Sequence, residues 1–194
     1  MVIYKNPELH LEIYPLEMSR WNDFESLFGA RGGCGGCWCM SWRLKKAEFD
    51  KSKGDGNKSL MKKLVKKNEE IGLLAYLDDK PVGWCSVAPR EDFIRLNNSK
   101  VLGRIDDKPV WSIVCFFINK NYRKMGLSAE ILKGVIEYCK SKGVSILEGY
   151  PVEPYSENMP AAFAWTGFPA AFFKAGFKEV ERRSKSRPIM RYYL

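Results

Sequence analysis

The chain has 194 residues, of which 45% are hydrophobic and 28% are charged. This length suits one compact domain with a substantial apolar core, and the composition is that of a globular protein rather than a fibrous or disordered one. No apolar run reaches the roughly 18 residues that a membrane span requires, and residues 1–10 contain no apolar signal-peptide core. We therefore expect a single domain over 1–194, located in the cytoplasm and without membrane contact.

The formal net charge is +9, and many of the lysines lie between residues 45 and 67. A basic protein can bind nucleic acid or a small polyanion such as a nucleotide cofactor. No recognition motif for RNA or DNA accompanies these lysines, so we interpret them as a solvated loop and helix face. We expect no nucleic-acid partner, and nucleic-acid binding stays a weaker alternative.

Apolar spacing in the first half of the chain predicts one strand followed by helices. Ser19 is a candidate N-cap for a helix that carries Trp21, Phe24 and Leu27 on one face. In chain order, the expected elements are a strand over 9–16, a helix over 19–28, a glycine-rich segment over 29–36, and helices over 42–49 and 58–68.

The second half predicts strands that alternate with helices. The clearest helix covers 125–142 and follows a continuously apolar strand of the kind that is buried on both faces. The expected elements are a hairpin over 72–77 and 81–88, a polar excursion over 90–107, a strand over 110–118, the helix, a strand over 144–150, a short helix over 169–175, and strands over 177–184 and 188–193. This order predicts an α/β (α+β) fold with a mixed sheet of six or seven strands flanked by helices.

The segment from 110 to 152 contains a strand, a turn and the amphipathic helix. The turn sequence is Arg123-Lys124-Met125-Gly126-Leu127-Ser128. Backbone N–H groups at a helix N-terminus have no intrahelical partner, and the helix dipole is positive there. A pyrophosphate is a natural ligand for such a turn, because Gly126 lets a phosphate approach closely and Ser128 adds a hydroxyl donor. A glycine placed here for steric reasons alone is the alternative explanation.

The turn matches the Arg/Gln-x-x-Gly-x-Gly/Ala signature of the GCN5-related N-acetyltransferases (GNAT superfamily), with Ser128 in the last position. Phe116-Phe117-Ile118 precedes it, and Phe172-Phe173-Lys174-Ala175-Gly176-Phe177 resembles the Tyr-x-x-x-Gly-Phe junction of the same family. The resemblance covers about 110–180. It implies a GNAT-like fold in which two central strands splay apart.

The resemblance also implies acetyl-CoA as co-substrate, with its pantetheine arm lying in the gap between the splayed strands. An acceptor amine would attack the thioester directly, and a backbone N–H would stabilise the oxyanion. By this resemblance the cofactor-binding residues are Phe116, Phe117, Ile118, Arg123, Lys124, Met125, Gly126, Leu127, Ser128 and Phe173.

The sequence departs from the family at the residues that transfer protons. Phe172 stands where the family often has a tyrosine that protonates the leaving thiolate, and phenylalanine cannot donate a proton. Tyr150, Tyr155 or water could serve instead, or the chain could be an inactive acyl-CoA-binding relative. The asparagine that often precedes the last helix is not evident, and Trp165-Thr166-Gly167-Phe168-Pro169 occupies its region.

A base must remove a proton from the acceptor ammonium. His10 precedes the first strand and is a poor candidate, whereas Glu148 lies inside an apolar strand at the expected splay. A carboxylate there could have a raised pKa and accept a proton, and an ion pair with a basic side chain is the alternative. Asp92 and Glu91 are weaker candidates. The predicted catalytic residues are therefore Glu148 and Tyr150.

The segment from Gly32 to Arg43 carries Cys34, Cys37, Trp38, Cys39 and Trp42. Cys34 and Cys37 have the C-x-x-C spacing of zinc sites and redox pairs, but no second pair completes a tetrahedral site, so we expect no metal. A glycine-flexible loop packed by its tryptophans is the simpler interpretation. By the family resemblance the loop borders the acceptor pocket, which makes Cys34, Cys37, Trp38 and Trp42 candidate substrate-binding residues and favours an apolar or cationic amine.

The sequence thus predicts an acetyl-CoA-dependent N-acetyltransferase that acts on a primary amine of a small molecule or peptide, and assembly into a homodimer is compatible with it. A non-catalytic acyl-CoA sensor is the first alternative. A redox or metal protein that uses Cys34, Cys37 and Cys39 is the second. The identity of the acceptor and the preferred acyl chain do not follow from the sequence.

Overall fold

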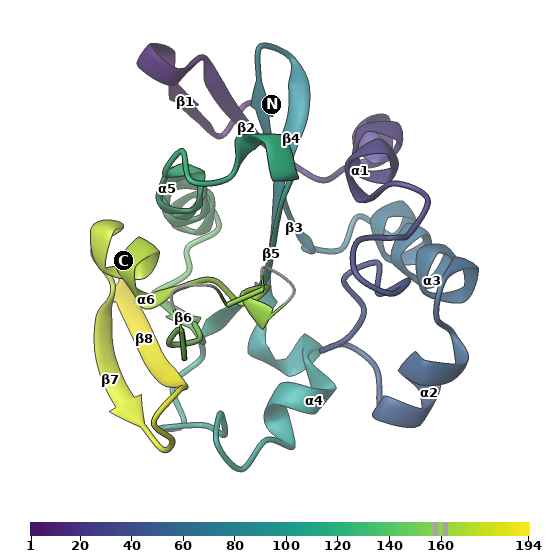
Figure 1. Ribbon diagram of the computed structural model, residues 1–194. Coiled ribbons are helices and arrows are strands. Elements are labelled where there is room, and N and C mark those ends of the chain that lie inside the picture. Colours follow the sequence, from purple (N-terminus) through teal and green to yellow (C-terminus); the bar gives the residue numbers. More distant parts are fainter. Residues whose placement is uncertain (157–158, 161–162) are drawn as a thin grey trace.

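The computed structural model describes residues 1–156, 159–160 and 163–194 (Figure 1). Its sheet has eight strands in the order β1-β2-β3-β4-β5-β6-β8-β7, one or two more than the sequence predicts. Every neighbouring pair is antiparallel except β5 and β6, which are parallel, so the predicted mixed sheet is confirmed. The strands are β1 (Tyr4–Asn6), β2 (Leu11–Pro15), β3 (Gly72–Leu77), β4 (Lys80–Pro89), β5 (Trp111–Ile118), β6 (Ile146–Gly149), β7 (Lys178–Arg182) and β8 (Pro188–Tyr193).

Helices cover both faces of the sheet. The helices are α1 (Trp21–Phe28), α2 (Lys46–Lys51), α3 (Asp55–Lys66), α4 (Ile94–Asn97), α5 (Leu127–Ser141) and α6 (Pro169–Lys174). Short 3-10 turns cover Pro7–Leu9, Met18–Arg20, Arg90–Asp92 and Lys120–Tyr122. In Figure 1, β5 stands between α5 on one side and α1 and α3 on the other. Two apolar clusters result, one under α1 and α3 and one under α5 and α6.

Three elements differ from the prediction. The edge strand β1 was not expected, because its three residues are too few to show a period. The helix expected over 42–49 begins only at Lys46, since Met40–Leu44 forms turns that bury Arg43. The excursion after β4 contains the short helix α4, whose Leu96 is buried.

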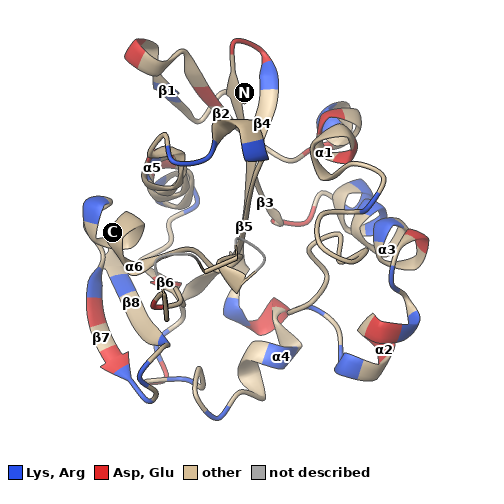
Figure 2. Ribbon diagram, viewed as in Figure 1, with Lys and Arg blue, Asp and Glu red and all other residues tan. Residues whose placement is uncertain are grey.

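The basic segment, residues 45–67, contains α2 and α3, and Figure 2 shows Lys and Arg residues along both helices. Several of its lysines have acidic partners: Lys46 lies 2.5 Å from Asp50, Lys53 lies 3.0 Å from the same carboxylate, and Lys58 pairs with Glu25. Positive charge on this face is therefore partly neutralised locally. Among the described residues, no helix is both long and apolar enough to cross a membrane.

The pairing between the central strands β5 and β6 ends partway along β5. Ser86 pairs with Cys115 and Val87 pairs with Ile113, so Val114 is an extra residue that forms a bulge opposite β4. The parallel pairing of β5 with β6 covers only Trp111–Ile113. Beyond Ile113 the two strands have no register partners in each other, which confirms the predicted splay.

Helix α5 is held close to the sheet by a glycine. A Cβ placed on Gly134 would lie 2.5 Å from Ile13 Cδ1 of β2, so a larger side chain would force the helix outward. The helix begins directly after Gly126, whose φ of 75° is in the left-handed region that favours glycine. The packing of α5 thus fixes where its first turn points.

Candidate functional site

The turn before α5 is open to solvent. Arg123, Lys124, Met125 and Gly126 are exposed, while Leu127 is buried and Ser128 is half-buried. Lys124 has a φ of 64° and Gly126 a φ of 75°, so two left-handed residues bend the backbone just before the helix. The first amides of α5 have no acceptor within the helix and carry the positive end of its dipole. These exposed donors can hold an anion.

Two basic side chains border this turn. Arg123 Nε donates to the carbonyl oxygen of Ile118 at 2.9 Å, which places the guanidinium at the end of β5. Lys174 Nζ is the atom nearest to a Cβ built on Gly126, at 4.0 Å. The sequence prediction chose Phe173, which is 53% exposed, and missed Lys174. The junction motif contains both residues, but only the fold brings α6 next to the start of α5.

The backbone N–H groups of β5 point alternately toward β4 and toward the gap between β5 and β6. Asn119 donates its N–H to Val82 of β4 at 2.9 Å, so the amide of Phe117 also faces β4. The amides of Phe116 and Ile118 therefore face the opposite side, where β6 has diverged. Phe116 donates this N–H to the carbonyl oxygen of Trp165 at 2.6 Å. The carbonyl oxygen of Trp165, in the segment before α6, thus accepts a hydrogen bond from one of the two N–H groups that face the gap.

Phe172 fills the narrow end of the gap. Its ring is fully buried and meets the ring of Phe116 edge-on, with centroids 5.9 Å apart. A Cβ placed on Gly149 of β6 would lie 2.1 Å from Phe172 Cε1. The side chain at this position is therefore a wedge between β5 and β6 and supplies no proton donor.

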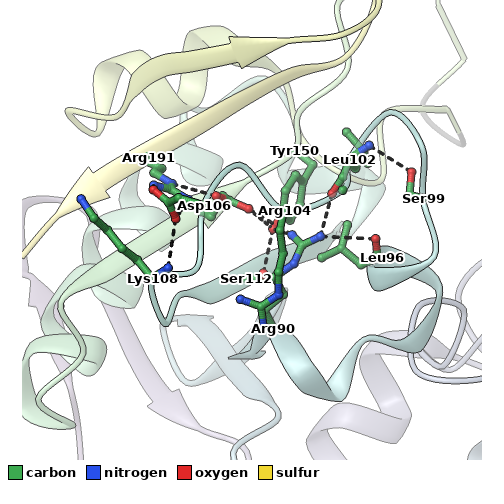
Figure 3. A network of polar contacts seen from close by, with 12 residues as sticks. Arg90, Leu96, Ser99, Leu102, Arg104, Asp106, Lys108, Ser112, Tyr150 and Arg191 are labelled. Carbon is green, nitrogen blue, oxygen red and sulfur yellow. Dashed lines mark hydrogen bonds and ion pairs between the residues drawn. The ribbon is translucent and has the colours of Figure 1, made fainter.

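The two predicted catalytic residues, Glu148 and Tyr150, lie in a buried ionic network, of which Figure 3 labels Tyr150, Arg90 and Arg191. Glu148 is 1% exposed, and its Oε1 accepts hydrogen bonds from Arg90 at 3.1 Å and from the Tyr150 hydroxyl at 2.6 Å. Its Oε2 accepts from Arg191 Nε at 2.7 Å. Arg191 also binds Asp106 at 2.7 and 3.0 Å, and this hydrogen bonding lowers the pKa of Asp106 to about 2.

This network argues against Glu148 as the base. Both carboxylate oxygens are occupied by cationic or phenolic donors, so the ion-pair alternative describes this side chain. Burial and the charge of Glu148 raise the pKa of Tyr150 well above its usual value, and its hydroxyl also meets Ser112 at 2.8 Å. Arg90 further donates to the carbonyl oxygens of Leu96 and Leu102. The network therefore ties β6, β8 and the excursion after β4 together.

The remaining proton-transfer candidates lie at the surface or in ion pairs. Tyr155 is 70% exposed. Glu91 pairs with Arg104, and Asp92 pairs with Arg43 at 3.2 Å. His10 is exposed and lies 3.8 Å from Asp78.

The cysteine-rich loop packs over β5. Trp38 stacks on Phe28 with centroids 5.7 Å apart, and Phe28 stacks on Phe117 of β5 at 5.0 Å. Trp42 stacks on Trp165 at 5.5 Å, so the loop also meets the segment before α6. Phe28 thus separates Trp38 from β5, while Trp42 lies against the segment whose Trp165 carbonyl covers the Phe116 amide.

The three loop thiols differ in exposure. Cys34 is exposed, Cys37 is half-buried and Cys39 is buried, and all six cysteines of the chain are free thiols. Among the residues that the structure describes, no group of three or more His, Cys, Asp or Glu side chains is placed to hold a metal ion.

The family model of the acetyltransferase (GNAT) family matches residues 38–168, which is more than half of the chain. The chain belongs to the GNAT acetyltransferase family. Members of this family use acetyl-CoA as co-substrate. A comparison with curated proteins gives no significant match.

Solved structures share the fold at low sequence identity. The PaiA N-acetyltransferase of Thermoplasma acidophilum, in complex with coenzyme A, is 16% identical with a TM-score of 0.53, and the match covers 95% of this chain and 99% of that one. The ribosomal-protein-S5-alanine acetyltransferase of Vibrio fischeri is 11% identical with a TM-score of 0.56, covering 100% and 96%. Ard1 of Thermoplasma volcanium is 12% identical with a TM-score of 0.52, covering 95% and 98%.

The position of Lys174 predicts a role in holding phosphate. Lys174→Gln should weaken coenzyme A binding roughly fivefold, because an exposed cation beside an anion contributes on the order of 1 kcal/mol. The loss should shrink at high ionic strength. Calorimetry with coenzyme A measures it, and Lys185→Gln, in the β7–β8 turn, is the matched control. Equal affinities for the two variants would contradict the assignment.

The buried network predicts a structural role for Glu148. Glu148→Gln should lower the free energy of unfolding by about 3–5 kcal/mol, because it leaves buried guanidinium groups without their counter-charge. Glu137→Gln, which breaks an exposed pair with Lys140, should cost only about 0.5 kcal/mol. Urea unfolding compares the two. A stable but inactive Glu148→Gln variant would restore the catalytic interpretation.

Proposed function

We propose that this protein transfers the acetyl group of acetyl-CoA to a primary amine of a small molecule or peptide. The observation that carries the proposal is the exposed turn at 123–126, which lies at the start of α5 and beside the gap between β5 and β6. Coenzyme A is a diphosphate with an extended pantetheine arm, so it needs an anion site with a gap beside it. The amine would attack the thioester directly.

The pyrophosphate would lie on the amides from Lys124 to Ser128, with Arg123 and Lys174 supplying positive charge. The pantetheine arm would run along β5 and hydrogen bond to its outward amides at Ile118 and Phe116. The Phe116 amide already has an acceptor in Trp165. We infer that the arm exchanges this bond for one of its own, so the segment before α6 shifts when the arm enters.

Catalysis would rest mainly on position and on backbone dipoles. A thioester carbonyl that takes the place of the Trp165 oxygen on the Phe116 amide would find there a donor for its developing oxyanion. Holding amine and thioester in attack geometry replaces a bimolecular encounter with a local one. Phe172 leaves the departing thiolate without the tyrosine donor that is frequent in the family, so its proton must come from elsewhere.

The acceptor would bind against the cysteine-rich loop, at Cys34, Cys37, Trp38 and Trp42. Trp38 also lines a crevice of about 670 Å³ together with Glu25, Asp55 and Lys58. Lys58 pairs with Glu25 and lies 5.2 Å from the centroid of the Trp38 ring, so this crevice already holds a cation beside its indole. A protonated amine would have to bind at the remaining aromatic surface of the loop, which favours a cation.

A second candidate function is acyl-CoA binding without turnover. The buried Phe172 wedge favours it, because the ring both removes the usual acid and narrows the gap. Release of free thiol from acetyl-CoA with a panel of primary amines distinguishes the two functions. A sensor would bind the cofactor and release no thiol above the hydrolysis background.

The phosphate turn gives the decisive experiment. Gly126→Val should reduce coenzyme A affinity at least 100-fold, because the side chain occupies the position that a phosphate must approach. Calorimetry on the wild type should show binding at micromolar concentrations.

Gly143→Val is the matched control, because Gly143 follows the other end of the same helix with a φ of 70° and open space around it. Both variants should lose about 1 kcal/mol of stability from the left-handed backbone. Retained cofactor binding by Gly126→Val, or none by the wild type at tens of micromolar, would refute the proposed function.

A further inference from the structure

Residues 164–168, the bridge segment, connect β5 to the chain that leaves β6. Phe116 of β5 donates its N–H to the carbonyl oxygen of Trp165 at 2.6 Å. On the other side, Val152 donates its N–H to the carbonyl oxygen of Gly167 at 3.0 Å. A Cβ placed on Gly167 would lie 3.2 Å from the ring of Phe116, so the segment also packs closely on β5. The bridge segment therefore closes the gap at the level of the Phe116 amide.

The closed bridge segment buries a polar group without satisfying it. Thr166 is 0% exposed, and within the described part of the chain its hydroxyl has no hydrogen-bond partner. A buried hydroxyl of this kind costs free energy, because it has lost its hydrogen bonds to water and made none in exchange. An open arrangement, in which Thr166 meets water or a ligand, therefore competes with the closed one.

An aromatic stack holds the bridge segment from the side of the cysteine-rich loop. The rings of Trp42 and Trp165 have centroids 5.5 Å apart, with 27° between their planes. Both rings are half-buried and pack against the same apolar cluster. Such a pair stabilises the conformation in which its rings meet beyond the apolar area that it buries. The stack therefore favours the position in which the Trp165 carbonyl covers the Phe116 amide.

Trp42 is the fixed member of this pair. Arg95 of α4 donates its backbone N–H to the carbonyl oxygen of Trp42 at 3.1 Å, and its guanidinium donates to Ser41 at 3.0 and 3.1 Å. The next residue, Arg43, is buried in an ion pair with the 3-10 turn after β4. Trp165, by contrast, lies in a segment without helix or strand. When the two rings separate, Trp165 is therefore the one that moves.

We propose that Trp42 is a positioning residue that lowers the affinity for acetyl-CoA without touching it, an inference that rests on the proposed function and deepens it. The cofactor can use the Phe116 amide only after the carbonyl oxygen of Trp165 has left it. Because Trp42 holds Trp165 in the closed position, the stack must separate as the cofactor enters. The free energy of the stack then opposes binding, as for any ligand that selects the less populated of two conformations.

Truncation of Trp42 should strengthen cofactor binding. Trp42→Ala should bind acetyl-CoA about 2- to 10-fold more tightly than the wild type, because loss of one aromatic stack shifts a two-state equilibrium by about that ratio. Calorimetry in the absence of an acceptor measures the affinity. A truncation that merely loosened the fold would weaken binding, so an unchanged or lower affinity would overturn the inference.

Two further variants control for the loss of an aromatic ring. Trp42→Phe keeps a smaller ring against Trp165, so its affinity should lie between those of the wild type and Trp42→Ala. Phe49→Ala removes a half-buried ring that packs against the same apolar cluster, and it should leave the affinity unchanged. Equal gains in affinity for Trp42→Ala and Phe49→Ala would contradict a specific role of the stack.

Thr166 predicts a change in the opposite direction. Thr166→Val replaces the unpartnered hydroxyl with a methyl group of similar shape, so the closed bridge segment loses its unsatisfied group and becomes more stable. The affinity for acetyl-CoA should fall about fivefold or more, in a protein at least as resistant to urea as the wild type. An affinity that is unchanged or higher would contradict the closed and open arrangements.

The stack can also be followed directly in the wild type. Two stacked indoles give a coupled circular dichroism signal in the far ultraviolet, which Trp42→Phe should lack. Saturating acetyl-CoA should reduce this signal in the wild type, because the rings separate.

The outcomes distinguish this inference from the proposed function. Wild-type protein that binds no acetyl-CoA would refute the proposed function, and the role of Trp42 with it. Equal affinities of the wild type and Trp42→Ala would overturn the role of Trp42 and leave the proposed function standing. Should Trp42→Ala fail to fold, the dichroism of the wild type decides, and a signal that persists at saturating acetyl-CoA would overturn the inference.

Discussion

The site depends on one interruption in the sheet, the end of the β5–β6 pairing after Ile113. An uninterrupted ladder would use every outward amide of β5 for pairing with β6. The bulge at Val114 changes the course of β5, so the amides of Phe116 and Ile118 point away from β4 to the side where β6 no longer pairs, and the Phe116 amide there meets the carbonyl oxygen of Trp165. Since α5 follows β5 after a short turn, the same divergence sets the phosphate turn beside the opening.

The closed end of the gap, where Ser112 of β5 still pairs with Glu148 of β6, is supported by buried charges. Arg90, Glu148 and Arg191 provide this support by joining η3 (Arg90–Asp92) to β6 and β8 through buried ion pairs. Phe172 supports the same region with an apolar wedge against Gly149. Such a network is costly to assemble, because each charge loses its hydration, and it is tolerable because both oxygens of Glu148 are satisfied. A carboxylate so fully engaged supports the packing of β6, β8 and η3 at this end of the gap.

The sequence predicted the parts of this site that are local in the chain. The apolar run of β5, Gly126 and the stripe of α5 lie within about 30 consecutive residues, and their periodicity identifies a strand, a turn and a helix. The partners of Glu148 could not be found this way, because Arg90 and Arg191 are separated from it by 58 and 43 residues. Lys174 and Trp165 were missed for the same reason: only the packing of α6 brings them to the turn and the gap. The short strand β1 lacked any periodic signal and depends on β2 for its existence.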